Sequence, residues 1–290
     1  MTTGRSLNTK PCVSVMMPCR NAGPFLQAAV GSVLAQPECL ELLVADGGST
    51  DGTLEQLEAI AASDSRLRII SRSDKGPADA LNKAFQAARG TLIGWLNADD
   101  LYDPGTLRRA VAELNAHPEW LMVYGEADHI DINGDLVSAY PTHPPSVGIN
   151  TFKDGCFICQ PTVVFKRSMG LLLGPFNTEL KTAFDFEYWL RAFNGFSKRI
   201  GYIPNIQAYS RLHAETITSN QRATVTLEAM ELIFNYCGHP PGHWLLNFAE
   251  ELFNKQAQPP QDVSLKQHLM EVLLKAKPWL SPNDQKEIPS

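Results

Sequence analysis

The first half of the chain alternates between two hydrophobic periodicities. Short apolar runs that stop at proline, glycine or polar residues predict buried strands. Apolar residues that return every three or four positions predict amphipathic helices between them. The predicted strands are residues 13–17, 41–45, 67–71, 91–96 and 120–124, and the predicted helices are residues 24–34, 53–62, 78–88 and 104–116.

This alternation predicts an α/β fold, with a parallel sheet covered by helices on both faces and connected by right-handed crossovers. Ligands of such sheets bind at the carboxyl ends of the strands. Most of the unusual polar residues of this half follow those ends, so we expect the functional site along one edge. The segments concerned are residues 18–23, 46–51, 73–79 and 97–102.

The pattern changes after Tyr124. Asn133-Gly134-Asp135 between two apolar runs predicts a hairpin. The later elements are expected as strands at 160–166 and 200–211 and helices at 184–193, 222–236, 244–253 and 263–275, with an irregular proline-rich stretch at 141–155. We therefore expect one domain at residues 1–218, with halves at about 12–125 and 126–218. A helical C-terminal extension at 219–290 would follow it.

Charge and hydropathy exclude several classes of protein. The chain has 290 residues and a formal net charge of -6, and no run of Lys or Arg interrupts it, so nucleic acid is not expected as a partner. No stretch reaches the 18 apolar residues of a spanning helix. Residues 1–12 lack the apolar segment of a secretory signal. We expect a cytoplasmic protein, with peripheral attachment to the inner face of the membrane as a variant.

The cysteines include one CxxC spacing, Cys156-Phe157-Ile158-Cys159. A tetrahedral zinc site needs two further soft or imidazole ligands, and no second CxxC or paired histidine motif supplies them. We therefore expect buried, reduced thiols here, with redox chemistry as the alternative.

Asn97-Ala98-Asp99-Asp100 follows a predicted buried strand and is the sharpest chemical feature. Two adjacent carboxylates repel each other unless a cation or hydrogen-bond donors are present. A hard divalent cation that bridges carboxylates to substrate phosphates would resolve this repulsion. We expect such a metal site, with a solvated loop pair or a helix cap as the alternative.

Two further sets of carboxylates are candidates. Asp46 ends a strand and precedes two glycines, so it could accept hydrogen bonds from a base or a ribose, or it could shape a turn. Asp185 and Glu187 begin a predicted helix and point in different directions. One could face a cleft while the other pairs with Arg191. Residues 18–23 hold a single glycine, which argues against a dinucleotide-binding loop.

In order along the chain, these motifs resemble glycosyltransferase family 2, whose members are inverting enzymes of the GT-A fold that use nucleotide-sugar donors. The resemblance covers residues 13–213. Residues 41–53 are similar to the nucleoside-binding motif, residues 74–77 and 79–83 to a donor-binding segment of one bacterial branch, and residues 93–100 to the metal-binding DxD region. Asp185 falls on the Asp of the "ED" base motif, and Arg211-Leu212-His213 resembles a late Arg-x-His element.

Two positions depart from the family pattern. Asn97 replaces the first Asp of DxD, and Phe184 replaces the Glu of "ED". The metal would then depend on Asp99 and Asp100, with His213 as an extra ligand, and the base would be Asp185.

The resemblance implies a role for each candidate residue. Glu187, Trp189 and Arg211 are expected to contact the acceptor or support the site, and Trp189 could instead belong to the core. The expected donor-binding residues are Pro18, Arg20, Asn21, Asp46, Gly48, Asp74, Lys75, Gly76, Asn82, Lys83, Asn97 and Asp99. The implied fold is a Rossmann-like, mostly parallel sheet with covering helices and a helical C-terminal extension.

The resemblance also implies the reaction. A sugar would pass from a UDP or dTDP donor, rather than a GDP donor, to a carbohydrate or lipid-linked acceptor, with Mn²⁺ or Mg²⁺, in bacterial cell-surface polysaccharide or glycoconjugate synthesis. One alternative is a non-catalytic nucleotide-sugar-binding scaffold. The other is a sugar nucleotidyltransferase, which would need a Gly-rich basic loop after the first strand. A homodimer through the C-terminal helices is a further expectation.

Overall fold

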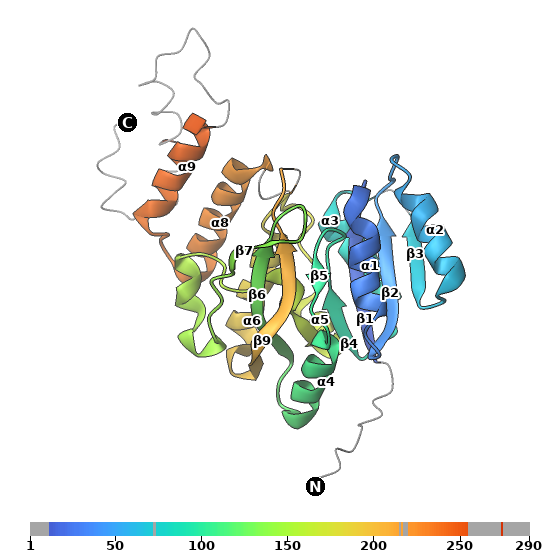
Figure 1. Cartoon of the computed structure of the whole chain (residues 1–290). Helices are drawn as coiled ribbons and strands as arrows, with labels where there is room; N and C mark the ends of the chain where they lie inside the picture. The colour runs from blue at the N-terminus through green and yellow to red at the C-terminus, as the bar shows by residue number, and fades with distance from the viewer. Residues whose placement is uncertain (1–11, 72–73, 215, 217–219, 255–273, 275–290) are drawn as a thin grey trace.

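The computed structural model describes residues 12–71, 74–214, 216, 220–254 and 274. Within them, a nine-stranded sheet forms the centre, in the order β3-β2-β1-β4-β8-β6-β9-β5, and β7 pairs with β6 (Figure 1). The strands are β1 (Val13–Cys19), β2 (Cys39–Asp46), β3 (Leu67–Ser71), β4 (Leu92–Trp95), β5 (Leu101–Tyr102), β6 (Met122–Ile130), β7 (Leu136–Ala139), β8 (Val164–Lys166) and β9 (Ile200–Arg211).

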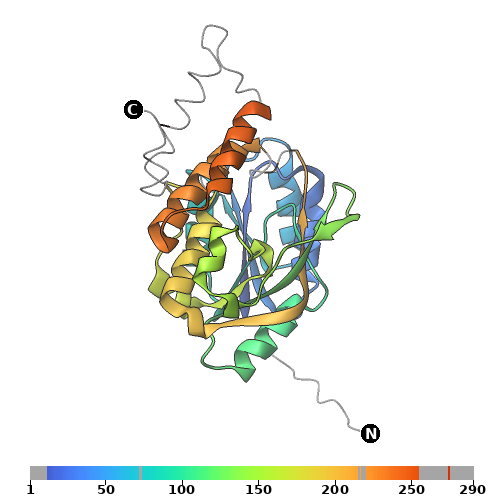
Figure 2. The same cartoon turned by 90° about the vertical axis from the view of Figure 1, so that its left-hand side faces the viewer.

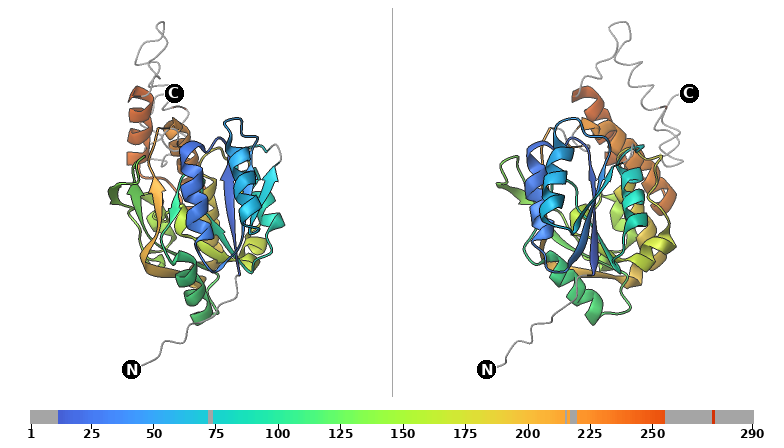
Figure 3. Two further views of the ribbon diagram at one scale, coloured as in Figure 1. Left: turned by 45° about the vertical axis from the view of Figure 1, so that its right-hand side comes forward. Right: turned by 90° about the vertical axis from the view of Figure 1, so that its right-hand side faces the viewer.

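Helices cover both faces of this sheet (Figure 3). The side chains of β1 alternate between the two faces: Val13, Val15 and Met17 pack toward α1, α2 and α4, whereas Met16 packs toward α3, α6 and α8. The helices are α1 (Leu26–Leu34), α2 (Thr53–Ser63), α3 (Pro77–Ala87), α4 (Thr106–Ala116), α5 (Arg167–Leu173), α6 (Phe184–Phe196), α8 (Arg222–Cys237) and α9 (Gly242–Asn254).

The sequence-based elements of the first half are confirmed, as is the hairpin, which β6 and β7 form. Two short elements, α5 and β5, were not predicted, because neither carries a full amphipathic period. Residues 160–162 form a 3₁₀ turn and only Val164–Lys166 is a strand, although we expected a strand throughout. The helix expected at 263–275 lies outside the described residues, apart from residue 274.

The strand directions are mostly parallel, as expected, but β6 does not lie beside β4. The short strand β8 separates them and is antiparallel to both. β6 then pairs in parallel with β9 as far as Arg211, with shifts in register at Gly125 and Glu126. A Cβ atom on Gly125 would lie 2.5 Å from the Ile203 carbonyl oxygen, so the close approach of the two strands there requires glycine.

The C-terminal helices lie along the outer side of α6 (Figure 2). Ala229, Met230, Leu232 and Ile233 of α8 are buried in the same hydrophobic core as α6 and the sheet. The domain boundary at residue 218 and a dimer through these helices stay predictions. Among the described helices, none combines the length and the apolar character that a bilayer crossing requires.

Candidate functional site

A cleft of about 730 Å³ opens at the carboxyl ends of the central strands. Ligands of parallel α/β sheets bind at this edge, and the sequence predicted the functional site there. The predicted site residues that line it are Pro18, Arg20, Asn21, Asp74, Gly76, Asn97, Asp99, Asp100, Asp185, Arg211 and His213. Those that do not line it are Asp46, Gly48, Lys75, Asn82, Lys83, Glu187 and Trp189.

Local hydrogen bonds occupy the carboxylate of Asp46. It accepts from the backbone N–H groups of Gly48 and Ser49, each at 3.1 Å, and from the Ser49 hydroxyl, and the residue is 1% exposed. Asn21 joins this loop to the end of β1, since its N–H donates to Ser49 Oγ and its Oδ1 accepts from the Thr50 N–H, both at 2.8 Å. In this structure Asp46 therefore shapes the turn.

Hydrogen bonds organise the segment after β4. The Asn97 side chain accepts from the Trp95 indole N–H at 3.0 Å and donates to Asp100 Oδ2 at 3.3 Å. Asp100 Oδ1 accepts the Arg211 backbone N–H at 2.8 Å. Burial, followed by the charge of Asp99, raises the pKa of Asp100 well above its usual range. Both oxygens of Asp100 thus have partners within the protein, which leaves Asp99 as the more accessible carboxylate of the pair.

Asp99 lies against His213, which follows the end of β9. The distance between Asp99 Oδ2 and His213 Nε2 is 3.0 Å, and their side chains are 29% and 12% exposed. Adjacent ligands of an octahedral cation, each ~2.0–2.1 Å from it, lie ~3 Å apart, so these two atoms fit one Mg²⁺ or Mn²⁺. Among the described residues, no three His, Cys, Asp or Glu side chains form a group able to hold a metal. Such an ion would need further oxygens from substrate or water.

Arg211 holds this corner together. Its guanidinium donates to the Asp99 carbonyl oxygen at 2.9 Å and to the Asp131 carbonyl oxygen at 2.7 Å. The residue is 6% exposed and lies over the Phe25 ring. It therefore fixes the Asp99 loop to the β6–β7 hairpin, and its side chain is already committed to these contacts.

Asp185 lies at the start of α6 and is half-buried in the cleft wall. Its Oδ1 accepts the backbone N–H of Phe186 at 2.7 Å. Burial raises the pKa of Asp185 to about 6, although this hydrogen bond opposes the shift. A carboxylate with that pKa is ionised at neutral pH and still basic enough to take a proton from a substrate.

Three of the predicted residues have structural partners away from the cleft. Glu187 pairs with Arg191 at 2.7 Å. From the sequence, we expected such a pair for one of Asp185 and Glu187. Lys83 pairs with Asp79 at 2.8 Å. Asn82 exchanges two hydrogen bonds with the backbone of Phe176, which uses both ends of its amide.

Trp189 has no exposed surface and contacts the ring of Trp95 in the core. The expectation that it stacks on an acceptor is therefore wrong for this conformation, because no acceptor can reach a fully enclosed ring. The alternative stated from the sequence, that Trp189 belongs to the core as aromatic residues on a helix usually do, is confirmed.

Two partners of the site were missed at the sequence level. Tyr140 lines the cleft, and its hydroxyl donates to the Cys156 carbonyl oxygen at 2.8 Å. Glu228 of α8 accepts the backbone N–H groups of Lys181, Thr182 and Ala183 at 2.8–2.9 Å, just before Asp185. No local motif marks a contact between residues this far apart in sequence.

The free thiols of Cys156 and Cys159 also line the cleft. Burial raises the pKa of both. Cys159 is buried as expected and Cys156 is half-buried, and that both thiols are reduced stays a prediction.

Comparison with known proteins decides the family. A sequence model described as glycosyl transferase family 2 matches residues 14–163, which is more than half of the chain. The chain belongs to glycosyl transferase family 2. The assignment made from the motifs, and with it the class of enzyme, is thereby confirmed.

Curated relatives of this family member include a chondroitin synthase of Escherichia coli, 30% identical over 187 residues. That alignment covers 64% of this chain and 27% of the synthase, so the chain spans about a quarter of that protein's length. A PGL/p-HBAD biosynthesis glycosyltransferase of Mycobacterium tuberculosis is 31% identical over 188 residues, covering 63% of this chain and 70% of the relative.

Solved structures share the fold. Residues 1–349 of TarS from S. aureus, in complex with UDP-GlcNAc, align with a TM-score of 0.66 at 19% identity, covering 96% of this chain and 83% of that one. The mannosyltransferase PcManGT of Pyrobaculum calidifontis, in complex with GDP-Man and Mn²⁺, aligns with a TM-score of 0.59 at 19% identity, covering 97% of this chain and 79% of that one. The GT-A type fold expected from the motifs is confirmed.

Proposed function

We propose that this chain transfers a sugar from a UDP or dTDP donor to a hydroxyl group of a carbohydrate or lipid-linked acceptor, with inversion at the anomeric carbon. One observation carries the proposal: the same cleft holds the Asp99–His213 pair and the half-buried carboxylate of Asp185. The UDP-GlcNAc complex of TarS supports a uridine donor.

Asp185 would act as the general base. Its carboxylate takes the proton from the acceptor hydroxyl as that oxygen attacks the anomeric carbon. The bond between this carbon and the diphosphate oxygen breaks at the same time, and the nucleoside diphosphate leaves with the electron pair. Attack from the face opposite the leaving group inverts the configuration of the carbon.

Asp99 and His213 would hold a divalent cation, and the Mn²⁺ complex of PcManGT supports this choice of cofactor. When bound, the cation neutralises charge on the departing diphosphate. Arg20 is exposed on the cleft rim and forms no ion pair with any described residue, so its guanidinium is available to the phosphates. The chondroitin synthase and the PGL/p-HBAD biosynthesis glycosyltransferase among the relatives support a role in the synthesis of a bacterial polysaccharide or glycoconjugate. A cell-surface product and a place at the cytoplasmic side of the membrane are part of the proposal.

The test is a thermal unfolding series with UDP, dTDP, GDP and CMP sugars, each with and without Mn²⁺. A donor present at 100 times its Kd stabilises the folded state by ~2.7 kcal/mol, which raises Tm by several degrees. We expect a metal-dependent rise with uridine or thymidine donors, and loss of the metal dependence in Asp99→Ala. If none of the donors raised Tm, the result would contradict the proposal. Donor binding without turnover on any acceptor would favour a binding scaffold.

A further inference from the structure

Gln160 is a buried residue of the cleft wall with half of its amide unsatisfied. It is 7% exposed, and its Nε2 donates to the Trp95 carbonyl oxygen at 2.7 Å. A carbonyl can only accept, so this contact fixes the orientation of the amide group. The Oε1 atom then has no hydrogen-bond partner among the described residues.

An unpartnered buried acceptor is costly. Leaving one inside a protein costs about 1–3 kcal/mol, and native structures pair nearly all such groups. Since Gln160 lines the cleft, a molecule bound there can supply the missing donor. The orphaned oxygen of Gln36 is buried in the same way, and what distinguishes Gln160 is that it lines the cleft, so a ligand that carries a hydroxyl or an N–H group can complete its hydrogen bonds.

The position of Gln160 along the cleft narrows the choice of ligand. Trp95, its partner, directly precedes the segment that contains Asp99. Cys159, its neighbour, has a thiol pKa raised by burial and then by the charges of Asp100, Cys156 and Asp185. This part of the cleft wall is thus near enough to Asp100, beside the proposed cation, and to Asp185, the proposed base, for both charges to act on it. The group transferred between those two ends is the sugar.

A second unpartnered atom lies in the same cleft wall. His129 of β6 lines the cleft, and its Nδ1 is buried with no hydrogen-bond partner among the described residues. Its ring lies 5.3 Å from that of Tyr140. The neighbouring lining residues Ile158, Pro161 and Phe184 are apolar. A few polar atoms in an apolar wall suit a sugar ring, whose hydroxyls need partners and whose C–H face does not.

We propose that Gln160 is a specificity-determining residue whose amide oxygen accepts a hydrogen bond from one hydroxyl group of the transferred sugar. The inference rests on the proposed function, because it takes the sugar of a nucleotide-sugar donor as the ligand. A site that hydrogen-bonds a substrate hydroxyl strongly rejects the analogue that lacks it, since its buried polar atom is left unpaired.

The experiment compares UDP-glucose and UDP-GlcNAc with their monodeoxy analogues, one for each ring hydroxyl. The readouts are the Kd of each donor by calorimetry and kcat/KM from the release of UDP. In the wild-type protein, removal of one particular hydroxyl should reduce kcat/KM about ten- to a hundredfold. In Gln160→Met that discrimination should fall to less than about threefold, while discrimination at the other hydroxyls is kept. If Gln160 had a purely structural role, Gln160→Met would lower kcat/KM for all donors by the same factor.

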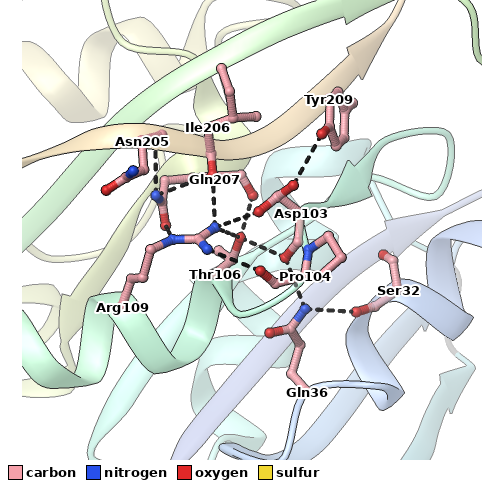
Figure 4. Close-up of polar contacts among 10 residues, drawn as sticks. All are labelled: Ser32, Gln36, Asp103, Pro104, Thr106, Arg109, Asn205, Ile206, Gln207 and Tyr209. Carbon is pink, nitrogen blue, oxygen red and sulfur yellow. Dashed lines mark hydrogen bonds and ion pairs between the residues drawn. The ribbon is translucent and has the colours of Figure 1, made fainter.

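Gln36 provides a matched control (Figure 4). It is 3% exposed, its Nε2 donates to the carbonyl oxygens of Ser32 and Asp103, and its Oε1 also lacks a partner among the described residues. Gln36 does not line the cleft. Gln36→Met should therefore lower stability in the same way as Gln160→Met and leave the discrimination between hydroxyls unchanged.

The outcomes separate the two proposals. If neither UDP sugars nor dTDP sugars bind the wild-type protein, the proposed function fails and the role of Gln160 fails with it. If they bind but no deoxy analogue loses more than about threefold, or if Gln160→Met keeps the wild-type discrimination, the role of Gln160 alone is overturned. Should Gln160→Met not fold, Gln160→Asn keeps the donor and the acceptor of an amide but withdraws both by one methylene, so it should weaken that one discrimination while the others are kept. Wild-type discrimination in Gln160→Asn would overturn the inference.

Discussion

At the scale of single residues, Asn97 explains a departure from the family motif. Its amide both accepts from Trp95 and donates to Asp100. A carboxylate at this position could not donate, and it would place a second negative charge against Asp100. Asparagine therefore satisfies the hydrogen bonds of this loop, and the proposed cation is left to Asp99 and His213.

The pH dependence of transfer reports on Asp185. Because burial raises the pKa of Asp185 to about 6, the basic form is lost as the pH falls through 6. We expect kcat/KM to be level above pH ~7 and to fall tenfold per pH unit well below 6. Initial rates measured from pH 4.5 to 8.5 check this. A profile that stays level down to pH 4.5 would remove Asp185 from the role of base.

Residues of the site differ in how well the sequence predicts them. Asp99 and Asp185 follow from local motifs, since each lies at a recognisable strand end or helix start. Gln160 and Glu228 do not, because their partners Trp95 and Ala183 are 65 and 45 residues away. Lys83 is a basic residue of the expected donor-binding segment, and in this structure it pairs with Asp79 of its own helix.

At the scale of elements, α8 supports the helix that carries Asp185. The Glu228 carboxylate accepts three successive backbone N–H groups and the Thr182 hydroxyl at the entry to α6. Burial opposes ionisation here, but these hydrogen bonds outweigh it and lower the pKa of Glu228. The C-terminal helices thus contribute to the site and do not merely follow it.

Replacement of Glu228 tests this contribution. Glu228→Ala should lower the free energy of unfolding by about 1–3 kcal/mol, since buried N–H groups lose their acceptor. It should also reduce kcat about tenfold while the Kd of the donor changes little, because Asp185 moves and the donor-binding segments do not. Glu231→Ala, an exposed position on the same helix, is the control. Equal effects of the two variants on kcat would refute the coupling.

The same scale shows which elements periodicity can reveal. Long strands and helices such as β9 and α6 carry several full periods and were predicted within a few residues. The strand β8 has three residues, and its place between β4 and β6 depends on long-range pairing. Sequence order alone therefore does not reveal the neighbours of β6.

At the scale of the whole molecule, Glu41 joins distant parts of the fold. Its side chain is fully buried and accepts hydrogen bonds from Ser14 of β1, Arg68 of β3 and Arg89 before β4. Burial alone would raise the pKa of Glu41, but these partners lower it to about 2. The depressed pKa stabilises the folded state fully above pH ~4.5, and that stability is lost as the pH falls toward 2.

The variant Glu41→Gln measures this contribution. The substitution removes a buried carboxylate but leaves the partly exposed Arg68 and Arg89 free to reach solvent, so we expect a loss of about 1–3 kcal/mol at pH 7. Urea unfolding at pH 7 and pH 3 provides the numbers. The difference between wild type and variant should shrink at the lower pH. A difference that is the same at both would show that the charge of Glu41 contributes nothing.

The release of UDP from UDP-GlcNAc and UDP-glucose, with a panel of sugar acceptors, tests the central claim most directly. It is measured at pH 7.5 with Mn²⁺ for the wild-type protein and for Asp185→Asn, alongside the Kd of each donor. We predict turnover by the wild type and a loss of at least about a hundredfold in Asp185→Asn, with donor affinity unchanged within about threefold. Equal turnover by the two proteins would contradict the proposed function at this cleft.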